Sequence, residues 1–231
     1  MSEAVLDTPV KDPSTSYSEQ AEAMTTVFLE QIPEADRDTL LSEFQAYLEG
    51  SSDGEQAIAT GEQAPVFTLP DHLGNNVDLG VELAHGPVVL SFYRGGWCPY
   101  CNIEFRGLQN ILPEIQSLGA QLIGLSPETP DVSAETVKAK GFEFTVLSDV
   151  GNKVARQYGL QTAVPEAIRP LYEKWELDVN GANGDNSWEL PLPATYVINR
   201  RGTVKAAFIN RDYTQRMEPN DIIAALKDIT R

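Results

Sequence analysis

The chain has 231 residues, enough for one large domain or for one domain with an appendage. Its formal net charge of −17 argues against binding to nucleic acid or to an anionic membrane surface, since both repel an acidic protein. Hydrophobic residues make up 42% of the chain, which suffices for a core, yet no stretch approaches the roughly 20 apolar residues that span a bilayer. The N-terminus shows no secretory signal, so a cytoplasmic and reducing location is expected.

The N-terminal part of the chain predicts two helices. Ser16 and Glu19 have the spacing of a capping box, which opens a helix. Pro33 suits the first turn of a second helix, which carries apolar residues on one face and ends at Gly50. Together they predict a helical hairpin whose apolar stripe packs on a core rather than on a partner.

Composition divides the chain into four segments. Polar residues and prolines at the start predict a flexible tail, and the polar stretch after Gly50 predicts a linker. The expected organisation is a tail over 1–15, a helical hairpin over 16–50, a linker over 51–60 and a main domain over 61–231.

Strand and helix patterns alternate through the main domain. The predicted strands lie at 66–69, 77–79, 88–92, 121–125, 144–147, 194–198 and 204–209. The predicted helices lie at about 99–118, 132–140, 149–158 and 219–229. This alternation predicts an α/β fold with a mixed sheet flanked by helices, built from parallel crossovers and one antiparallel pair.

The two cysteines of the chain, Cys98 and Cys101, stand a few residues after the apolar run Val88–Phe92. Pro99 fits the first turn of a helix, which places Cys98 at or beside the N-cap and Cys101 about one turn later. Free N–H groups and the helix dipole favour a thiolate at that end. Cys98 is therefore expected to be the more acidic and more exposed thiol, with Cys101 more sheltered. The pair predicts a reversible dithiol/disulfide couple.

Other uses of a cysteine pair fit this sequence less well. A structural zinc site normally needs four Cys or His ligands, and His72 and His85 stand outside any ligand spacing. Both histidines follow turn-like segments and are expected at the surface, so a Cys-His protease would lack its base. Inert core cysteines would not need the Gly-Gly-Trp run that precedes the pair. The favoured interpretation is redox chemistry without a metal or an organic cofactor.

Several stretches resemble a known family. The run Trp97-Cys98-Pro99-Tyr100-Cys101 at a strand–helix junction resembles the thioredoxin superfamily. Further stretches resemble the peroxiredoxin branch, the alkyl hydroperoxide reductase and thiol-specific antioxidant proteins, and its peroxiredoxin-like subgroup with Cys-x-x-Cys: 64–71, 92–93, 147–149 and 210–219. The resemblance covers about residues 61–231. It implies a thioredoxin-like fold and an antioxidant, thiol-dependent oxidoreductase.

The cysteine motif departs from that of peroxiredoxins, which reads Phe-Tyr-Pro-x-x-x-Thr-x-x-Cys. Alignment on Phe92-Tyr93 puts Arg94 at the proline, Cys98 at the threonine and Cys101 at the peroxidatic cysteine. The family's arginine stands just before the strand expected at 194–198, and here that place holds Pro193. The resemblance therefore implies a hybrid site in which either cysteine is a candidate to react first.

Neighbouring residues are candidates for the same site. Pro193 resembles the cis-proline that packs against the dithiol of thioredoxins, with an ordinary trans proline at a strand start as the alternative. Arg94 is either a cation beside the thiolate or a solvated loop residue. Trp97 is expected to shield the thiol or to form a substrate platform, with simple packing as the alternative. Arg211 and Arg216 are expected in surface or terminal-helix pairs rather than at the site.

The segment Leu171–Leu192 holds two tryptophans and a Gly/Asn-rich run, and it predicts a long loop. A loop in this position is expected to cover the site or to form a dimer contact. A homodimer therefore stays open as an interpretation.

These residues predict a redox enzyme that reduces disulfide or peroxide substrates, with thioredoxin-type disulfide exchange slightly favoured. In that mechanism the Cys98 thiolate attacks the substrate and Cys101 resolves the intermediate. One alternative is a thiol peroxidase, a hydroperoxide reductase with Cys101 as the peroxidatic cysteine. Another is a non-enzymatic redox-sensing module whose hairpin docks a partner. Either enzyme would need an external reductant such as thioredoxin, glutaredoxin or a low-molecular-weight thiol.

Overall fold

A five-stranded mixed sheet forms the centre of the protein in the computed structural model, which describes residues 15–229. Its strands are β3 (Val88–Phe92), β4 (Gln121–Ser126), β5 (Thr145–Ser148), β8 (Ala194–Ile198) and β9 (Val204–Ile209). The strand order is β5-β4-β3-β8-β9, with β3, β4 and β5 parallel and with β8 antiparallel to both of its neighbours. This is the expected thioredoxin-like mixed sheet. Apart from Thr15, the expected tail lies outside the described residues.

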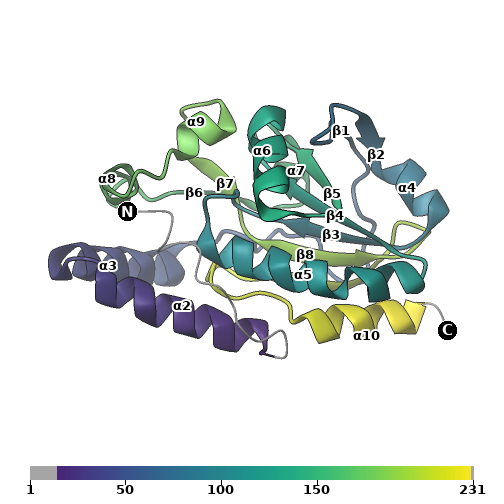
Figure 1. Ribbon diagram of the computed structural model, residues 1–231, viewed down its shortest axis with the longest axis horizontal. Coiled ribbons are helices and arrows are strands. Elements are labelled where there is room, and N and C mark those ends of the chain that lie inside the picture. Colours follow the sequence, from purple (N-terminus) through teal and green to yellow (C-terminus); the bar gives the residue numbers. More distant parts are fainter. Residues whose placement is uncertain (1–14, 230–231) are drawn as a thin grey trace.

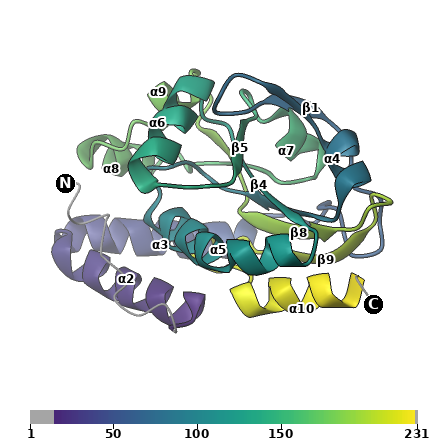
Figure 2. The same cartoon turned by 45° about the vertical axis from the view of Figure 1, so that its right-hand side comes forward.

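Helices cover both faces of the sheet (Figures 1 and 2). One face carries α2 (Tyr17–Gln31), α5 (Pro99–Ser117) and α10 (Pro219–Ile229). The other face carries α4 (Leu79–His85) and α7 (Lys153–Gln157). Side chains of β3 alternate between these two cores, and all of its residues are buried. The strand that leads to the cysteines is therefore fixed from both sides.

The remaining elements are short or lie at the ends of the sheet. They are α3 (Glu34–Gly50), β1 (Thr68–Pro70), β2 (Asn76–Asp78), α6 (Pro130–Lys140), β6 (Gln161–Ala163), α8 (Arg169–Lys174), α9 (Val179–Asn183) and β7 (Glu189–Pro191). Strands β1 and β2 form the expected hairpin, and β6 pairs with β7 in a second small sheet.

Helices α2 and α3 form the predicted N-terminal hairpin. The Ser16 hydroxyl accepts a hydrogen bond from the Glu19 amide, and the Glu19 carboxylate accepts one from the Ser16 amide, which is the predicted capping box. On the inner side of α2, Tyr17, Ala21 and Met24 are buried in the core shared with α5 and α10. The stripe thus packs on the core of the protein, as expected.

The segment Leu171–Leu192 is folded, and the prediction of a long loop was wrong. It contains part of α8, all of α9 and strand β7. Its residues Tyr172 and Trp175 are buried with Leu40 of the hairpin in a third core. The Asp178 side chain caps α9 by accepting a hydrogen bond from the Gly181 amide. A five-residue helix of this composition has too short a hydrophobic pattern to be recognised from sequence.

A few boundaries also differ from expectation. The predicted strand at 77–79 stops one residue early, because the Asp78 side chain caps α4. Pro33 is the N-cap of α3 rather than part of its first turn. Asp149 was predicted to cap α7, but Asn152 is the N-cap residue. The Asp149 carboxylate still supports the start of the helix, since it accepts hydrogen bonds from the amides of Val154 and Ala155.

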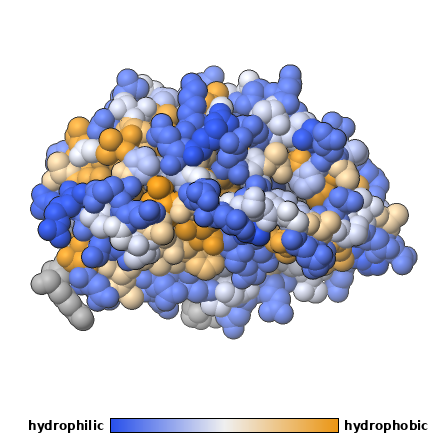
Figure 3. Space-filling model, turned by 180° about the vertical axis from the view of Figure 1, so that it is seen from behind, coloured by the Kyte–Doolittle hydropathy of each residue, from blue (hydrophilic) through white to orange (hydrophobic). Residues whose placement is uncertain are grey.

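The surface is predominantly hydrophilic on the face seen in Figure 3, where apolar side chains are scattered among polar ones. Within residues 15–229, no helix has the length and apolar character needed to cross a membrane.

Candidate active site

The dithiol lies where the predicted strand–helix junction puts it. Strand β3 ends at Phe92, a short loop follows, and α5 begins at Pro99. Cys98 is the N-cap residue of α5, with extended backbone angles (φ −85°, ψ 119°). Cys101 lies in the first turn of the same helix. Proline at the first position needs no hydrogen-bond partner for its nitrogen, which stabilises this start of the helix.

Two glycines let the loop pass close to its neighbours. At Gly95 (φ +145°) a Cβ atom would lie 2.3 Å from Nε1 of Trp97. At Gly96 a Cβ atom would lie 2.4 Å from Oγ1 of Thr136. The Gly-Gly run before the cysteines is therefore needed for packing of this loop as well as for its backbone conformation.

Both sulfurs are hidden from solvent, which corrects one prediction. Cys98 is 0% exposed and Cys101 is 1% exposed, so Cys98 is not the more exposed thiol. Cys98 nevertheless borders a cavity of about 40 Å³, whose lining does not include Cys101. The wall comes mainly from aromatic and apolar side chains of α2, α3, α8 and the cysteine loop, together with Arg94: Phe28, Leu40, Trp97, Tyr100, Tyr172, Trp175, Leu177 and Tyr213.

Arg94 is a buried cation beside the N-terminal cysteine, and the alternative of a solvated loop residue is wrong. Its side-chain Nη1 lies 3.8 Å from Sγ of Cys98, and Nη2 donates a hydrogen bond of 2.8 Å to Oη of Tyr172. The guanidinium also lies 4.2 Å from the ring centre of Tyr213 and 5.0 Å from that of Trp97.

Trp97 closes the cavity beside the cysteine. Its ring meets Tyr172 edge to face at a centroid distance of 5.9 Å. It is half-buried and packs at the border of two cores. Trp97 therefore lies beside the Cys98 thiol, where the predicted shield would be, and also packs against both cores.

Arg216 lies at the dithiol, and the prediction that it stays outside the site was wrong. It is 4% exposed, and its Nη2 lies 3.5 Å from Sγ of Cys101. Its Nε donates a 2.6 Å hydrogen bond to Glu104, a residue of α5 that is also buried. The sequence predicts a surface or terminal-helix pair for Arg216, because nothing in the local sequence shows that the chain after β9 returns to the dithiol. Arg211 does form the expected surface pair, with Glu55.

Each sulfur thus has its own guanidinium, but the two thiols differ in acidity. Burial raises the pKa of Cys98, yet hydrogen bonds from Cys101 and the charges of Arg94 and Arg216 outweigh it and lower the pKa to about 5. Burial, the hydrogen bond donated to Cys98 and the charge on that sulfur raise the pKa of Cys101 well above its usual range. The prediction that Cys98 is the more acidic thiol agrees with these contacts, although guanidinium charges act in addition to the helix terminus.

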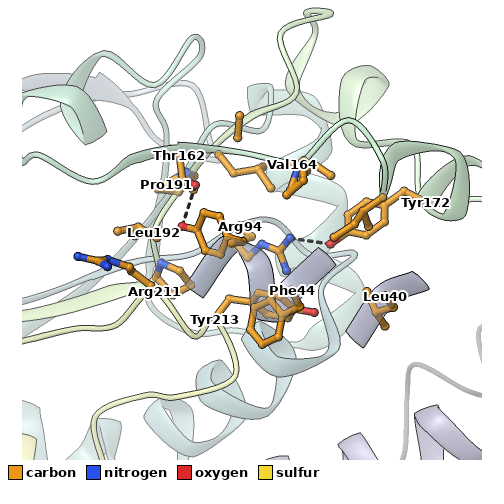
Figure 4. A pocket seen from close by; sticks show the side chains of 16 residues that line it. Leu40, Phe44, Arg94, Thr162, Val164, Tyr172, Pro191, Leu192, Arg211 and Tyr213 are labelled. Carbon is orange, nitrogen blue, oxygen red and sulfur yellow. Dashed lines mark hydrogen bonds between the residues drawn. The ribbon is translucent and has the colours of Figure 1, made fainter. Parts of the chain in front are cut away.

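Pro193 is not among the residues that line the cavity beside Cys98. The peptide bonds of the described residues are all trans, so the resemblance to a cis-proline was wrong and the alternative of a trans proline before β8 holds. Pro193 lines a second cavity of about 40 Å³, whose lining also includes Arg94. Figure 4 shows this cavity, with Arg94 bonded to Tyr172 and with Phe44 and Tyr213 nearby.

A second buried carboxylate, that of Glu128, binds the backbone of the cysteine loop. Glu128 is 1% exposed and accepts hydrogen bonds from the Gly96 amide and from Oη of Tyr93. Sequence reasoning missed Glu104 and Glu128. Glu104 had a local signal, since it lies one helical turn after Cys101 and a charge on a buried helix face needs a partner. Within residues 15–229, no group of three His, Cys, Asp or Glu residues is placed to hold a metal ion.

Comparisons with known proteins agree with this architecture. The profile of the AhpC/TSA family matches residues 60–207. Chloroplastic peroxiredoxin Q of Gentiana triflora is 29% identical over 154 residues, which are 67% of this chain and 60% of that protein. Peroxiredoxin Bcp of Escherichia coli is 29% identical over 103 residues, which are 45% of this chain and 65% of that protein. The match therefore spans less than two thirds of either relative.

A solved structure has the same fold. The crystal structure of peroxidoxin BcpB from Mycobacterium tuberculosis is similar to this protein, with a TM-score of 0.59 and 24% sequence identity. The superposition covers 74% of this chain and 98% of the BcpB chain. The helical hairpin precedes the residues that the family profile matches. The family profile matches more than half of the chain, and the mixed sheet with the dithiol at the β3–α5 junction agrees with it. This chain therefore belongs to the AhpC/TSA family, the peroxiredoxin branch of the thioredoxin superfamily.

Proposed function

We propose that the protein is a thiol-dependent peroxidase in which the Cys98 thiolate attacks a hydroperoxide and Cys101 resolves the product. One observation carries this proposal. The sulfur of Cys98 borders a cavity of about 40 Å³, lies 3.8 Å from the Arg94 guanidinium and has a second thiol within hydrogen-bond reach. A thiolate so placed is available at neutral pH.

The size of the cavity favours a peroxide over a protein disulfide. About 40 Å³ accommodates roughly three water-sized groups, which is enough for a hydroperoxide head. A protein disulfide would have to bring its own backbone up to a sulfur that is 0% exposed. Disulfide exchange, the favoured prediction from sequence, therefore takes second place to peroxide reduction.

The two thiols together supply the two electrons that reduce one hydroperoxide. The Cys98 thiolate attacks the terminal oxygen of the hydroperoxide, the O–O bond breaks, and the alkoxide leaves and takes a proton from water. Cys98 becomes a sulfenic acid. The Cys101 sulfur then displaces the hydroxyl group, which leaves with the thiol proton as water, and the disulfide forms. The peroxide has gained two electrons, and the thiols have lost them.

The charges around the site fit this sequence of steps. Arg94 stabilises negative charge where the thiolate attacks and where the alkoxide forms, because it points to Cys98 and is held by Tyr172. Arg216 faces the thiol that becomes the leaving group when the disulfide is reduced again. An external thiol, either thioredoxin, glutaredoxin or a small thiol, would supply those electrons. The proposed chemistry requires no metal or organic cofactor.

A second candidate assigns the first attack to Cys101. Its sulfur accepts hydrogen bonds from the Arg94 amide and the Arg216 guanidinium, both at 3.5 Å. It also holds the position of the peroxidatic cysteine in the aligned family motif. Its raised pKa and its absence from the cavity lining favour Cys98 instead.

The test uses the wild type with Cys98→Ser and Cys101→Ser. Each protein is mixed with hydrogen peroxide, and sulfenic acid is trapped with dimedone and located by mass spectrometry. We expect rapid trapping on Cys98 in the Cys101→Ser protein and little reaction of the Cys98→Ser protein. Fast sulfenic acid formation on Cys101 in the Cys98→Ser protein would instead establish the second candidate.

Parallel turnover assays separate the remaining functions. Peroxide consumption and reduction of a small disulfide are measured with the same preparation and with dithiothreitol as the reductant. We expect peroxide consumption to dominate. Efficient disulfide reduction without peroxide consumption would favour the exchange enzyme, and no turnover of either substrate would favour a redox-sensing module.

A further inference from the structure

The two guanidiniums at the dithiol differ in their counter-charge. Arg216 forms an ion pair with Glu104, with 2.6 Å between Nε and Oε2, and both side chains are almost fully buried. Among residues 15–229, Arg94 is paired with no carboxylate, and its partners are Cys98, the Tyr172 hydroxyl and two aromatic rings. The positive charge near Cys101 is therefore largely cancelled, and the positive charge near Cys98 is not.

We propose that Glu104 is a positioning residue that keeps the thiolate on Cys98, by cancelling the charge of the guanidinium that faces Cys101. The inference deepens the proposed function and rests on it, since it gives a physical reason why the N-terminal cysteine attacks first. Glu104 contacts neither substrate nor sulfur in this role. It acts through Arg216.

Geometry supports the proposal because the thiols compete for one negative charge. A single guanidinium within about 4–6 Å lowers the pKa of an acidic group by about 1–3 units. Each sulfur has such a guanidinium, so the two cations alone would favour both sulfurs. Glu104 forms an ion pair with Arg216 but not with Arg94, so it weakens the attraction of the negative charge to Cys101 and leaves Cys98 favoured.

Three hydrogen-bond donors hold the Glu104 carboxylate in place. Its Oε1 accepts hydrogen bonds from Thr195 of β8 at 3.1 Å and from Ser91 of β3 at 3.3 Å, while Oε2 binds Arg216. These three donors satisfy a carboxylate that has lost its water. Burial raises the pKa of Glu104 above its usual value, and the charge and hydrogen bonds of Arg216 and the hydroxyls of Thr195 and Ser91 limit that rise.

The other ionisable groups near Cys101 do not change the difference in charge between the two thiols. Besides Cys98, Arg216 and Glu104, the groups near Cys101 are the phenols Tyr17 of α2 and Tyr93 after β3. Burial raises the pKa of both tyrosines far above neutrality, so both are uncharged at the pH of interest. The buried carboxylate of Glu128 interacts electrostatically with Cys98, but its hydrogen bonds come from the Gly96 amide and the Tyr93 hydroxyl rather than from a guanidinium. Within residues 15–229, Glu104 is the carboxylate that forms an ion pair with a guanidinium at the dithiol.

The test is a direct titration of both thiols by NMR. Protein labelled with [3-¹³C]cysteine gives only two cysteine signals, because the chain has two cysteines, and the ¹³Cβ shift reports thiol or thiolate even for a buried sulfur. The wild type is compared with Glu104→Gln and with Thr195→Val, which removes one donor to the carboxylate but keeps the side-chain shape. Glu114→Gln is the matched control, since Glu114 lies on the same helix and pairs with Lys227 at the surface.

In the wild type we expect Cys98 to titrate first and Cys101 to stay a thiol through neutral pH. In Glu104→Gln the Cys101 midpoint should fall by about one pH unit or more, and thiolate should appear on both sulfurs. Thr195→Val should move it in the same direction by less, and it carries the test if Glu104→Gln does not fold. The control should match the wild type.

An unchanged Cys101 midpoint in the folded variants would overturn the inference. That result is independent of turnover, because the titration needs no substrate. If the titration behaves as expected but the wild type consumes no peroxide, the proposed function fails while the charge assignment stands. If peroxide is consumed but Glu104→Gln leaves both midpoints in place, the inference alone fails.

Discussion

The guanidinium of Arg94 points at Cys98, with 3.8 Å between Nη1 and Sγ, from four residues earlier in the chain. Both residues are buried, and the Tyr172 hydroxyl holds the other end of the guanidinium. A buried cation whose other contacts are neutral favours an anion beside it. This relationship explains how Cys98 can be a thiolate although burial alone would oppose ionisation.

Replacing Arg94 by glutamine should raise the pKa of Cys98 by about one unit or more. The rate of sulfenic acid formation at pH 7 should fall by roughly 10²-fold, as when an electrostatic donor is removed from other active sites. Stopped-flow measurement with hydrogen peroxide checks the rate, and NMR titration checks the pKa. Arg200→Gln is the control, because Arg200 is exposed and its guanidinium donates a hydrogen bond to the Ala84 carbonyl, not to a residue of the dithiol site. An equal loss in both variants would argue against the assigned role of Arg94.

The reaction should depend on pH through Cys98. Because the contacts of Cys98 lower its pKa to about 5, the rate constant with peroxide should be flat near neutrality and fall as pH drops through 5. The measurement is a stopped-flow rate profile from acidic to neutral pH. A midpoint near the ordinary cysteine value of about 8.5 would contradict the assignment.

The same lowered pKa should make stability depend on pH. Between about pH 5 and the ordinary thiol pKa of about 8.5, the unfolded Cys98 binds a proton that the folded thiolate does not. The reduced protein should therefore gain stability with rising pH across this window and lose it as pH falls through 5, relative to Cys98→Ser. Urea unfolding under reducing conditions at pH 5, 6.5 and 8 measures the difference. A difference that shrinks with rising pH would show the opposite linkage.

Tyr172→Phe should release one end of Arg94 while keeping the aromatic ring. The lost hydrogen bond of 2.8 Å goes to a charged group, so the free energy of unfolding should fall by about 2 kcal/mol and the peroxide rate should fall with it. Tyr158→Phe is the matched control, since its hydroxyl binds the Pro65 carbonyl in the other core. That variant should lose about 1 kcal/mol and keep the peroxide rate. Equal rates in the two variants would show that Tyr172 does not position Arg94.

Phe28→Ala should enlarge the cavity next to Cys98 from the side of the hairpin. Phe28 lines that cavity and meets Trp175 edge to face at 5.4 Å. We expect a loss of about 2 kcal/mol in stability, less than the roughly 3–5 kcal/mol of a fully buried Phe, because Phe28 is half-buried. The rate with cumene hydroperoxide should rise relative to that with hydrogen peroxide.

Leu41→Ala provides the comparison for the hairpin variant, because Leu41 is 45% exposed and does not line the cavity. Its stability and its ratio of the two peroxide rates should remain close to those of the wild type. If Phe28→Ala leaves the ratio of rates unchanged, the hairpin is not part of the wall that limits substrate size.

Much of the fold followed from local patterns. The buried run Val88–Phe92 and the amphipathic helix after Pro99 were recognisable because burial on both faces and helical periodicity leave strong signals. The capping box of α2 and the final helix were equally local. In contrast, α8 and α9 were missed because such short helices depend on burial of residues such as Trp175 rather than on periodicity.

The sequence by itself determined the dithiol, its place at the start of a helix and the sheet that supports it, since these depend on residues close together in the chain. Only the tertiary structure decided what surrounds the sulfurs. Tyr172 reaches Arg94 across 78 positions, and Arg216 reaches Cys101 across 115. Burial of Cys98 likewise depends on the hairpin and on the segment before β8. Electrostatic effects act through space, so the choice of the first cysteine to react depends on contacts that sequence spacing does not encode.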